Sequence, residues 1–161
     1  MDITINYEYG REDVGPFPLR ELAGFVIEQE GKPANTEASI SFVDDSEIAR
    51  LNETYRQKQG PTDVLSFECD GCDDGFDDSE ALLGNSDGED AAIPFELGDI
   101  VIATDVAKRQ TREFGTTLQE EVELLLTHGL LHLCGYDHIE DDEAEIMEAR
   151  ERELLAAWRS R

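Results

Sequence analysis

Hydrophobic and polar positions follow two different periods along this chain. Side chains on a strand point alternately to opposite faces, whereas apolar residues three and four apart lie on one face of a helix. The alternating or β-branched runs, which predict strands, are 3–7, 38–43, 64–67 and 99–103. The runs with helical spacing are 19–30, 46–56, 105–114, 118–134 and 141–158. Because strands and helices follow one another without a regular repeat, we expect an α+β fold with a small mixed sheet.

The helix predicted over 118–134 has recognisable signals at both ends. Thr117 followed by Glu120 fits a capping box, and Gly135 stands where a left-handed residue would end the helix. Its second half, LLLTHGLLHLCG, is apolar almost all round. This pattern is typical of a helix buried at the centre of a domain.

Length and charge limit the class of protein. A chain of 161 residues can bury its own core, so we expect 1–161 to form a single domain. No run approaches the length of a membrane span, and the N-terminus has no basic region followed by an apolar run, so we expect a cytoplasmic protein. Three cysteines without a secretion signal argue against a disulfide scaffold. The net charge of -26 repels polyanions and anionic membranes at long range.

Much of the acid gathers at 69–94, a stretch rich in Asp, Gly and Ser with no sustained period. We expect a mobile acidic loop inserted into the domain. Its Cys69 and Cys72 form a C-x-x-C, which can be half a zinc site or a redox pair. With no second C-x-x-C and no βαβ context, we interpret them as two unpaired thiols.

All three histidines of the chain lie in HGLLHLCGYDH (128–138). His128 and His132 are four residues apart and share a helix face, and a turn at Gly135 lets His138 return to them. Three imidazoles suit one Zn²⁺ with a fourth position open to water, which is typical of a catalytic site. Two alternatives stay open: core histidines without metal, and a structural zinc with Cys134 as the fourth ligand. Cys134 would point about 200° around the helix from His132, so we favour catalysis.

The spacing H-x-x-x-H-x-x-G-x-x-H is that of the metzincin proteases. In those enzymes a Glu after the first His is the general base. Gly129 occupies that position and cannot accept a proton, so peptide hydrolysis by the usual route is not expected.

The same stretch resembles the signature of the YbeY family, zinc-dependent single-strand endoribonucleases of bacterial rRNA maturation. LNETYRQKQGPTDVLSF (51–67) and LGDIVIAT (97–104) resemble two further family blocks. The resemblance implies one Zn²⁺ held by His128, His132 and His138, with Arg56 as a functional residue. It also implies action on 16S rRNA 3′ ends and in ribosome quality control. The implied partners are single-stranded rRNA and the small ribosomal subunit or its proteins, with neither membrane nor DNA.

Arg56 also has a physical interpretation, because a guanidinium can contact two oxygens of a phosphorus that gains negative charge. Arg50 and Lys58, in the same basic stretch, are candidate RNA-binding residues. The alternative is that Arg56 only ends an exposed helix, where a cation favours the negative end of the dipole.

The general base is not identified by the sequence. Asp137 is adjacent to a predicted ligand and could act as the base or orient that ligand, but it could equally cap the turn. Asp63 and Asp99 are weaker candidates.

Two other functions stay open: a metalloprotease-like hydrolase with a non-standard base, and a zinc-containing ribosome assembly factor without catalysis. Gly129 counts against the first, and Arg56 together with an open metal site counts against the second. Since RNA affinity begins with neutralisation of phosphates, the net charge predicts weak, salt-dependent binding to naked RNA.

Overall fold

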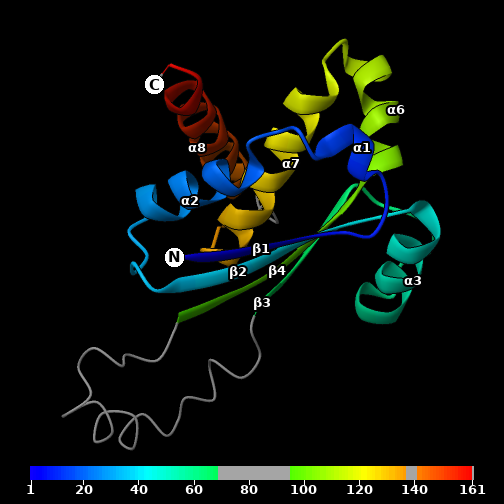
Figure 1. Cartoon of the computed structure of the whole chain (residues 1–161), viewed down its shortest axis with the longest axis horizontal. Coiled ribbons are helices and arrows are strands. Elements are labelled where there is room, and N and C mark those ends of the chain that lie inside the picture. Colours follow the sequence, from blue (N-terminus) through cyan, green and yellow to red (C-terminus); the bar gives the residue numbers. More distant parts are fainter. Residues whose placement is uncertain (69–94, 137–140, 161) are drawn as a thin grey trace, which may run out of the picture.

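The computed structural model describes residues 1–68, 95–136 and 141–160 (Figure 1). The expected acidic loop at 69–94, with Cys69 and Cys72, lies outside the described residues. Asp137 and His138 also lie outside them. The predictions made for these residues therefore stay predictions.

The described strands form one mixed sheet. Their bounds are β1 (Asp2–Tyr7), β2 (Thr36–Val43), β3 (Val64–Glu68) and β4 (Phe95–Ala103). The order is β1-β2-β4-β3, in which β1, β2 and β4 are parallel and β3 pairs antiparallel with β4 at the edge. The predicted α+β class and mixed sheet are confirmed. β4 begins at Phe95 and not at residue 99 as predicted. Its first residues pair with β2 before a register shift between Glu37 and Ala38, and this irregularity interrupts the alternation of apolar and polar residues in β4.

Helices lie on both faces of this sheet. Their bounds are α1 (Arg11–Val14), α2 (Leu19–Gln29), α3 (Asp45–Arg56), α6 (Thr104–Phe114), α7 (Leu118–Leu133) and α8 (Asp141–Arg159). The helices α2, α7 and α8 lie on one face of this sheet, and α3 lies on the other face near one end (Figure 1). The five predicted helices are confirmed, and α1 was missed because one turn shows no period. Among the described helices, none is both long and apolar enough to cross a membrane.

α7 lies at the centre of the main core, where it packs on one face of the sheet and against the helices α2 and α8 (Figure 1). Leu126 and Leu130 are fully buried, together with Ile100 of β4. Gly129 allows this close packing, since a Cβ added there would lie 3.1 Å from a methyl carbon of Ile100. The predicted central helix is confirmed.

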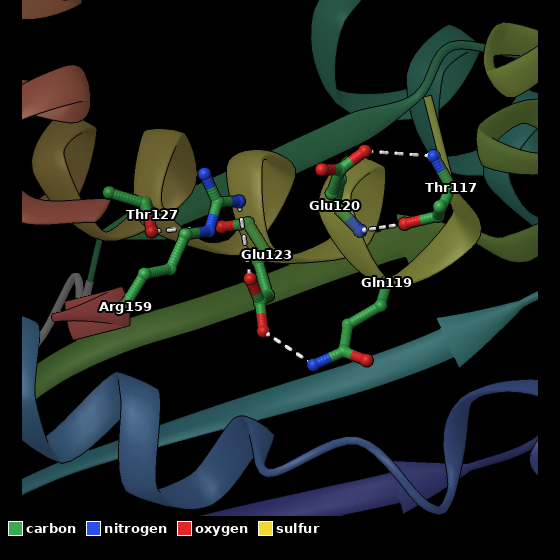
Figure 2. Close-up of polar contacts among 6 residues, drawn as sticks. All are labelled: Thr117, Gln119, Glu120, Glu123, Thr127 and Arg159. Atoms are coloured by element: carbon green, nitrogen blue, oxygen red, sulfur yellow. Dashed lines mark hydrogen bonds and ion pairs between the residues drawn. The ribbon is translucent and has the colours of Figure 1, made fainter. Parts of the chain in front are cut away.

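The N-terminal half of α7 is held by polar contacts (Figure 2). The Thr117 hydroxyl accepts from the Glu120 amide at 3.1 Å, and the Glu120 carboxylate accepts from the Thr117 amide at 3.0 Å. This is the predicted capping box. One turn later, the buried Glu123 carboxylate accepts from Gln119 at 3.0 Å and from Arg159 of α8 at 3.3 Å.

The C-terminal end of α7 is the predicted glycine cap. Gly135 has φ +107°, and its amide donates to the His132 carbonyl at 3.0 Å. The next amide, of Tyr136, donates to the Leu131 carbonyl at 3.0 Å. These two hydrogen bonds define a Schellman motif, which satisfies carbonyls at the helix end and turns the chain back beside His132.

The opposite face of the sheet is covered at one end by α3. There Ile48 is buried in a second apolar cluster with Val43, Leu65, Val101 and Ala103. The polar residues of this face project beyond α3, and they form the floor of the cleft described next.

Candidate active site

A cleft of about 1380 Å³ lies over the polar part of the sheet. Its described lining comes from three places: the sheet floor, the end of α3 with β3, and the end of α7. The lining includes Asp2, Thr4, Glu37, Ser39, Tyr55, Arg56, Ser66, Phe67, Glu96, Asp99, His132 and Tyr136. The structure therefore brings Arg56 and His132, which are far apart in sequence, to one cavity.

The floor of the cleft is a row of residues that runs across all four strands. Thr4 pairs with Ser39, Ser39 with Asp99, and Asp99 with Phe67. Paired residues project from the same face of a sheet, so these four side chains are neighbours. The Ser39 hydroxyl donates to the Asp99 carboxylate at 2.5 Å, which holds Asp99 within the floor.

The two weaker candidates for a general base are thereby distinguished. Asp99 lines the cleft. Asp63 instead ties β3 to α6, because one of its oxygens accepts from the Val64 amide at 2.7 Å and the other from Gln110 at 3.1 Å. Of the two, the structure places only Asp99 where a substrate could reach it.

Arg56 is the last residue of α3, and its guanidinium donates to the Ser66 carbonyl of β3 at 2.9 Å. The helix ends there because Gln57 is left-handed, with φ 58°. Within the described part of the chain, Arg56 forms no ion pair with a carboxylate. By contrast, Arg50 pairs with Glu47 at 2.7 Å.

Arg50 and Lys58 are not among the described residues that line the cleft. Arg50 points its guanidinium along α3 to its own helix partner, and the Lys58 amide closes the end of α3 on the Asn52 carbonyl. Their role in RNA binding stays a prediction. Arg56 is the member of the basic stretch that the fold directs into the cavity.

His128 and His132 lie edge to face, with ring centroids 4.6 Å apart and planes at 85°. Each ring has an oxygen beside its Nδ1. For His132 it is the Tyr136 carbonyl at 3.1 Å, which the turn at Gly135 presents. For His128 it is the carboxylate of Glu151 at 2.5 Å, a residue of α8 that is only 6% exposed.

These contacts fit a metal site. A neutral imidazole that donates from Nδ1 carries its lone pair on Nε2, the atom that would ligate a metal. An oxygen behind each ligand is the usual arrangement around zinc histidines, since it sets both tautomer and ring orientation. Over 1–68, 95–136 and 141–160, no three His, Cys, Asp or Glu residues gather in a metal-binding group, and His138 lies outside these ranges.

Cys134 is a poor candidate for a fourth ligand. It caps α7, packs against the main core and is not among the described residues that line the cleft. Burial raises the pKa of its thiol to about 11. A thiol ligates zinc as the thiolate, which is disfavoured in this environment.

Glu151 is the site residue that the sequence pattern missed. Acidic and basic residues alternate at 148–154, which is typical of a solvated helix face, but the structure buries Glu151. Its spacing from the buried Met147 and Leu155, one turn away on each side, was the available signal. Because α8 packs on α7, the helix face that carries Met147, Glu151 and Leu155 is turned toward α7, and the Glu151 carboxylate reaches His128.

Known proteins of one family are similar to nearly the whole chain. The family model described as "Endoribonuclease YbeY" matches residues 6–159. A relative of that name from Acidothermus cellulolyticus is 42% identical over 160 residues, covering 99% of this chain and 93% of its own. Another from a Nocardioides species is 42% identical over 164 residues and covers 100% of both chains. The solution structure of TM1509 from Thermotoga maritima has a TM-score of 0.57 and 25% identity, covering 98% of this chain and 92% of that one.

Proposed function

The chain belongs to the YbeY family, and on that premise we propose that it is a metal-dependent endoribonuclease acting on single-stranded rRNA. Relatives named as endoribonucleases support this proposal. The observation that carries it is the cleft in which Arg56 and His132 lie together. We extend the proposal to 16S rRNA 3′ maturation and ribosome quality control in the cytoplasm, with the small subunit or its proteins as partners and 1–161 as one domain.

In this proposal His128, His132 and His138 hold one Zn²⁺. When bound, the ion would polarise a phosphoryl oxygen and lower the pKa of a water molecule. Glu151 and the Tyr136 carbonyl restrain the two described rings, so their Nε2 atoms keep one orientation without the ion. This restraint lowers the entropic cost of assembling the site.

Arg56 binds the phosphate that is cleaved. Its guanidinium is anchored to the Ser66 carbonyl through one nitrogen, which leaves further N–H groups to donate to phosphoryl oxygens. As the phosphorus gains negative charge, these hydrogen bonds strengthen. Asp99 in the cleft floor and Asp137 are the candidates to accept the proton of the attacking water.

The two alternative functions have less support. Position 129 packs against Ile100 of β4, so even a Glu there would point into the core and not act as a protease base. An assembly factor without catalysis is less favoured by a cleft that brings Arg56 together with His132, a proposed metal ligand.

Cleavage of end-labelled single-stranded RNA tests the proposal. Wild type, His132→Ala, Arg56→Ala and the control Arg109→Ala, an exposed arginine whose partner is Asp45, would be compared with and without a chelator, at low and physiological salt. We expect cleavage by wild type and Arg109→Ala, and loss of cleavage with the other two variants and with chelator. Equal cleavage by all four proteins would indicate a contaminating ribonuclease. No cleavage by zinc-loaded wild type would favour the assembly factor.

A further inference from the structure

An aromatic pair lies beside Arg56 in the cleft. Tyr55 of α3 and Phe67 of β3 have ring centroids 5.4 Å apart and planes at 70°. Phe67 packs against the second apolar cluster and is half-buried, whereas Tyr55 is 62% exposed. Exposed rings are common on protein surfaces, so what distinguishes Tyr55 is its position in the lining of the cleft beside Arg56.

The pair and the arginine form one unit. Tyr55 and Arg56 are consecutive at the end of α3, and Ser66 and Phe67 are consecutive in β3. The Arg56 hydrogen bond to the Ser66 carbonyl and the Tyr55–Phe67 ring contact therefore tie the same two segments together. A phosphate bound by Arg56 would thus lie next to an aromatic surface, because Tyr55 precedes Arg56 directly in α3.

The charges of the cleft orient a nucleotide within it. Asp2, Glu37, Glu96 and Asp99 line the part of the cleft that the sheet provides. These carboxylates repel phosphates, whereas an uncharged base can lie close to them. The phosphate backbone of an RNA strand is therefore favoured at Arg56. The base of the bound nucleotide would then turn inward, toward Phe67 and Asp99, which are paired across the sheet.

We propose that Tyr55, supported by Phe67, is a stacking platform for an unpaired nucleobase adjacent to the phosphate that Arg56 binds. This inference rests on the proposed function and adds a base-binding subsite to it. Stacking on an aromatic side chain requires a base that has left its duplex, because paired bases already stack on each other. The platform would therefore contribute to selection of single strands without selecting a sequence, since every base has a flat face.

The test compares two oligonucleotides with equal numbers of phosphates. One is a short 2′-O-methyl oligoadenylate, and the other has abasic residues throughout. Binding of both to the zinc-loaded protein would be measured by fluorescence anisotropy for wild type, Tyr55→Ala, Tyr55→Phe and Phe114→Ala. Phe114 is the matched control, because it is 64% exposed at the end of another helix and is not among the described residues that line the cleft.

We expect wild type to bind the oligoadenylate about 5-fold to 100-fold more tightly than the abasic strand. Tyr55→Ala should lose most of this ratio by weakening only the oligoadenylate, and Tyr55→Phe and Phe114→Ala should keep it. An unchanged ratio in folded Tyr55→Ala would overturn the platform. Cleavage by the same preparations separates the two proposals: if wild type cleaves RNA, such a result removes the platform alone. If wild type neither cleaves nor binds RNA, both proposals fail.

Discussion

Glu151→Gln tests the metal site through a residue that touches a proposed ligand but is not one. The Glu151 carboxylate lies 2.5 Å from Nδ1 of His128 and is almost completely buried. Glutamine has nearly the same shape and can still accept a hydrogen bond, but it lacks the negative charge. The imidazole ring of His128 is then held less firmly, and its Nε2 becomes a weaker ligand for the metal.

The expected effect is a 10- to 100-fold weaker zinc affinity, which is typical when the oxygen partner of a ligating histidine is altered. At 25 °C this range corresponds to about 1.4–2.7 kcal/mol of binding free energy. The weaker hydrogen bond should also lower the free energy of unfolding of the metal-free protein, by on the order of 1 kcal/mol.

Glu123→Gln is the matched control. Glu123 is 3% exposed and Glu151 is 6% exposed, and both lie in the helices that form the site. Each substitution changes the net charge by one, from -26 to -26 + 1 = -25, so any effect of overall charge on zinc is the same. The Glu123 carboxylate contacts Gln119 and Arg159 (Figure 2), and no described contact joins it to His128 or His132, so its variant should bind zinc as wild type does.

Zinc dissociation constants would be measured by competition with a chromophoric chelator, starting from metal-free protein, and urea unfolding would verify that each variant is folded. Unchanged affinity in Glu151→Gln would contradict a role for this carboxylate at the site. Equal weakening in both variants would show that lost charge or stability, and not the contact to His128, controls the affinity.

Three further predictions concern the cap, the arginine and the cysteine. Gly135→Ala should lower the free energy of unfolding by about 1–2 kcal/mol, because the φ of Gly135 is +107°. Gly24→Ala inside α2 should instead raise the free energy of unfolding by about 0.5–1 kcal/mol. Urea unfolding measures both variants, and equal stabilities would contradict this account. Arg56→Lys keeps the charge but loses the forked donor, so kcat/KM for RNA should fall about 100-fold. The altered contact to the Ser66 carbonyl should change the free energy of unfolding by no more than about 1 kcal/mol, and retained activity would mean that charge alone suffices. Cys134 should alkylate slowly at pH 8, because burial raises the pKa of its thiol to about 11 and the thiolate is scarce below that pH; rapid labelling of its peptide in mass spectrometry would refute this.

Local interactions explain why the sequence alone predicted so much. The capping box joins Thr117 to Glu120, the glycine cap joins Gly135 to His132, and the facing histidines are one helical turn apart. All of these contacts are short-range, so residue types at fixed spacing were sufficient to predict them. The same holds for the five longer helices and the four strands, whose periods are visible in single segments.

The sequence by itself thus determined the five longer helices, the existence of the four strands, the ends of α7 and the histidine pair on one helix face. Only the tertiary structure decided that Glu151 of α8 supports His128, that Asp99 and not Asp63 faces the cleft, and that Tyr55 meets Phe67. Each of these contacts joins segments that are separate in the sequence. No local period specifies such pairs, because they arise when helices bury their apolar faces against the sheet and carry polar side chains along with them.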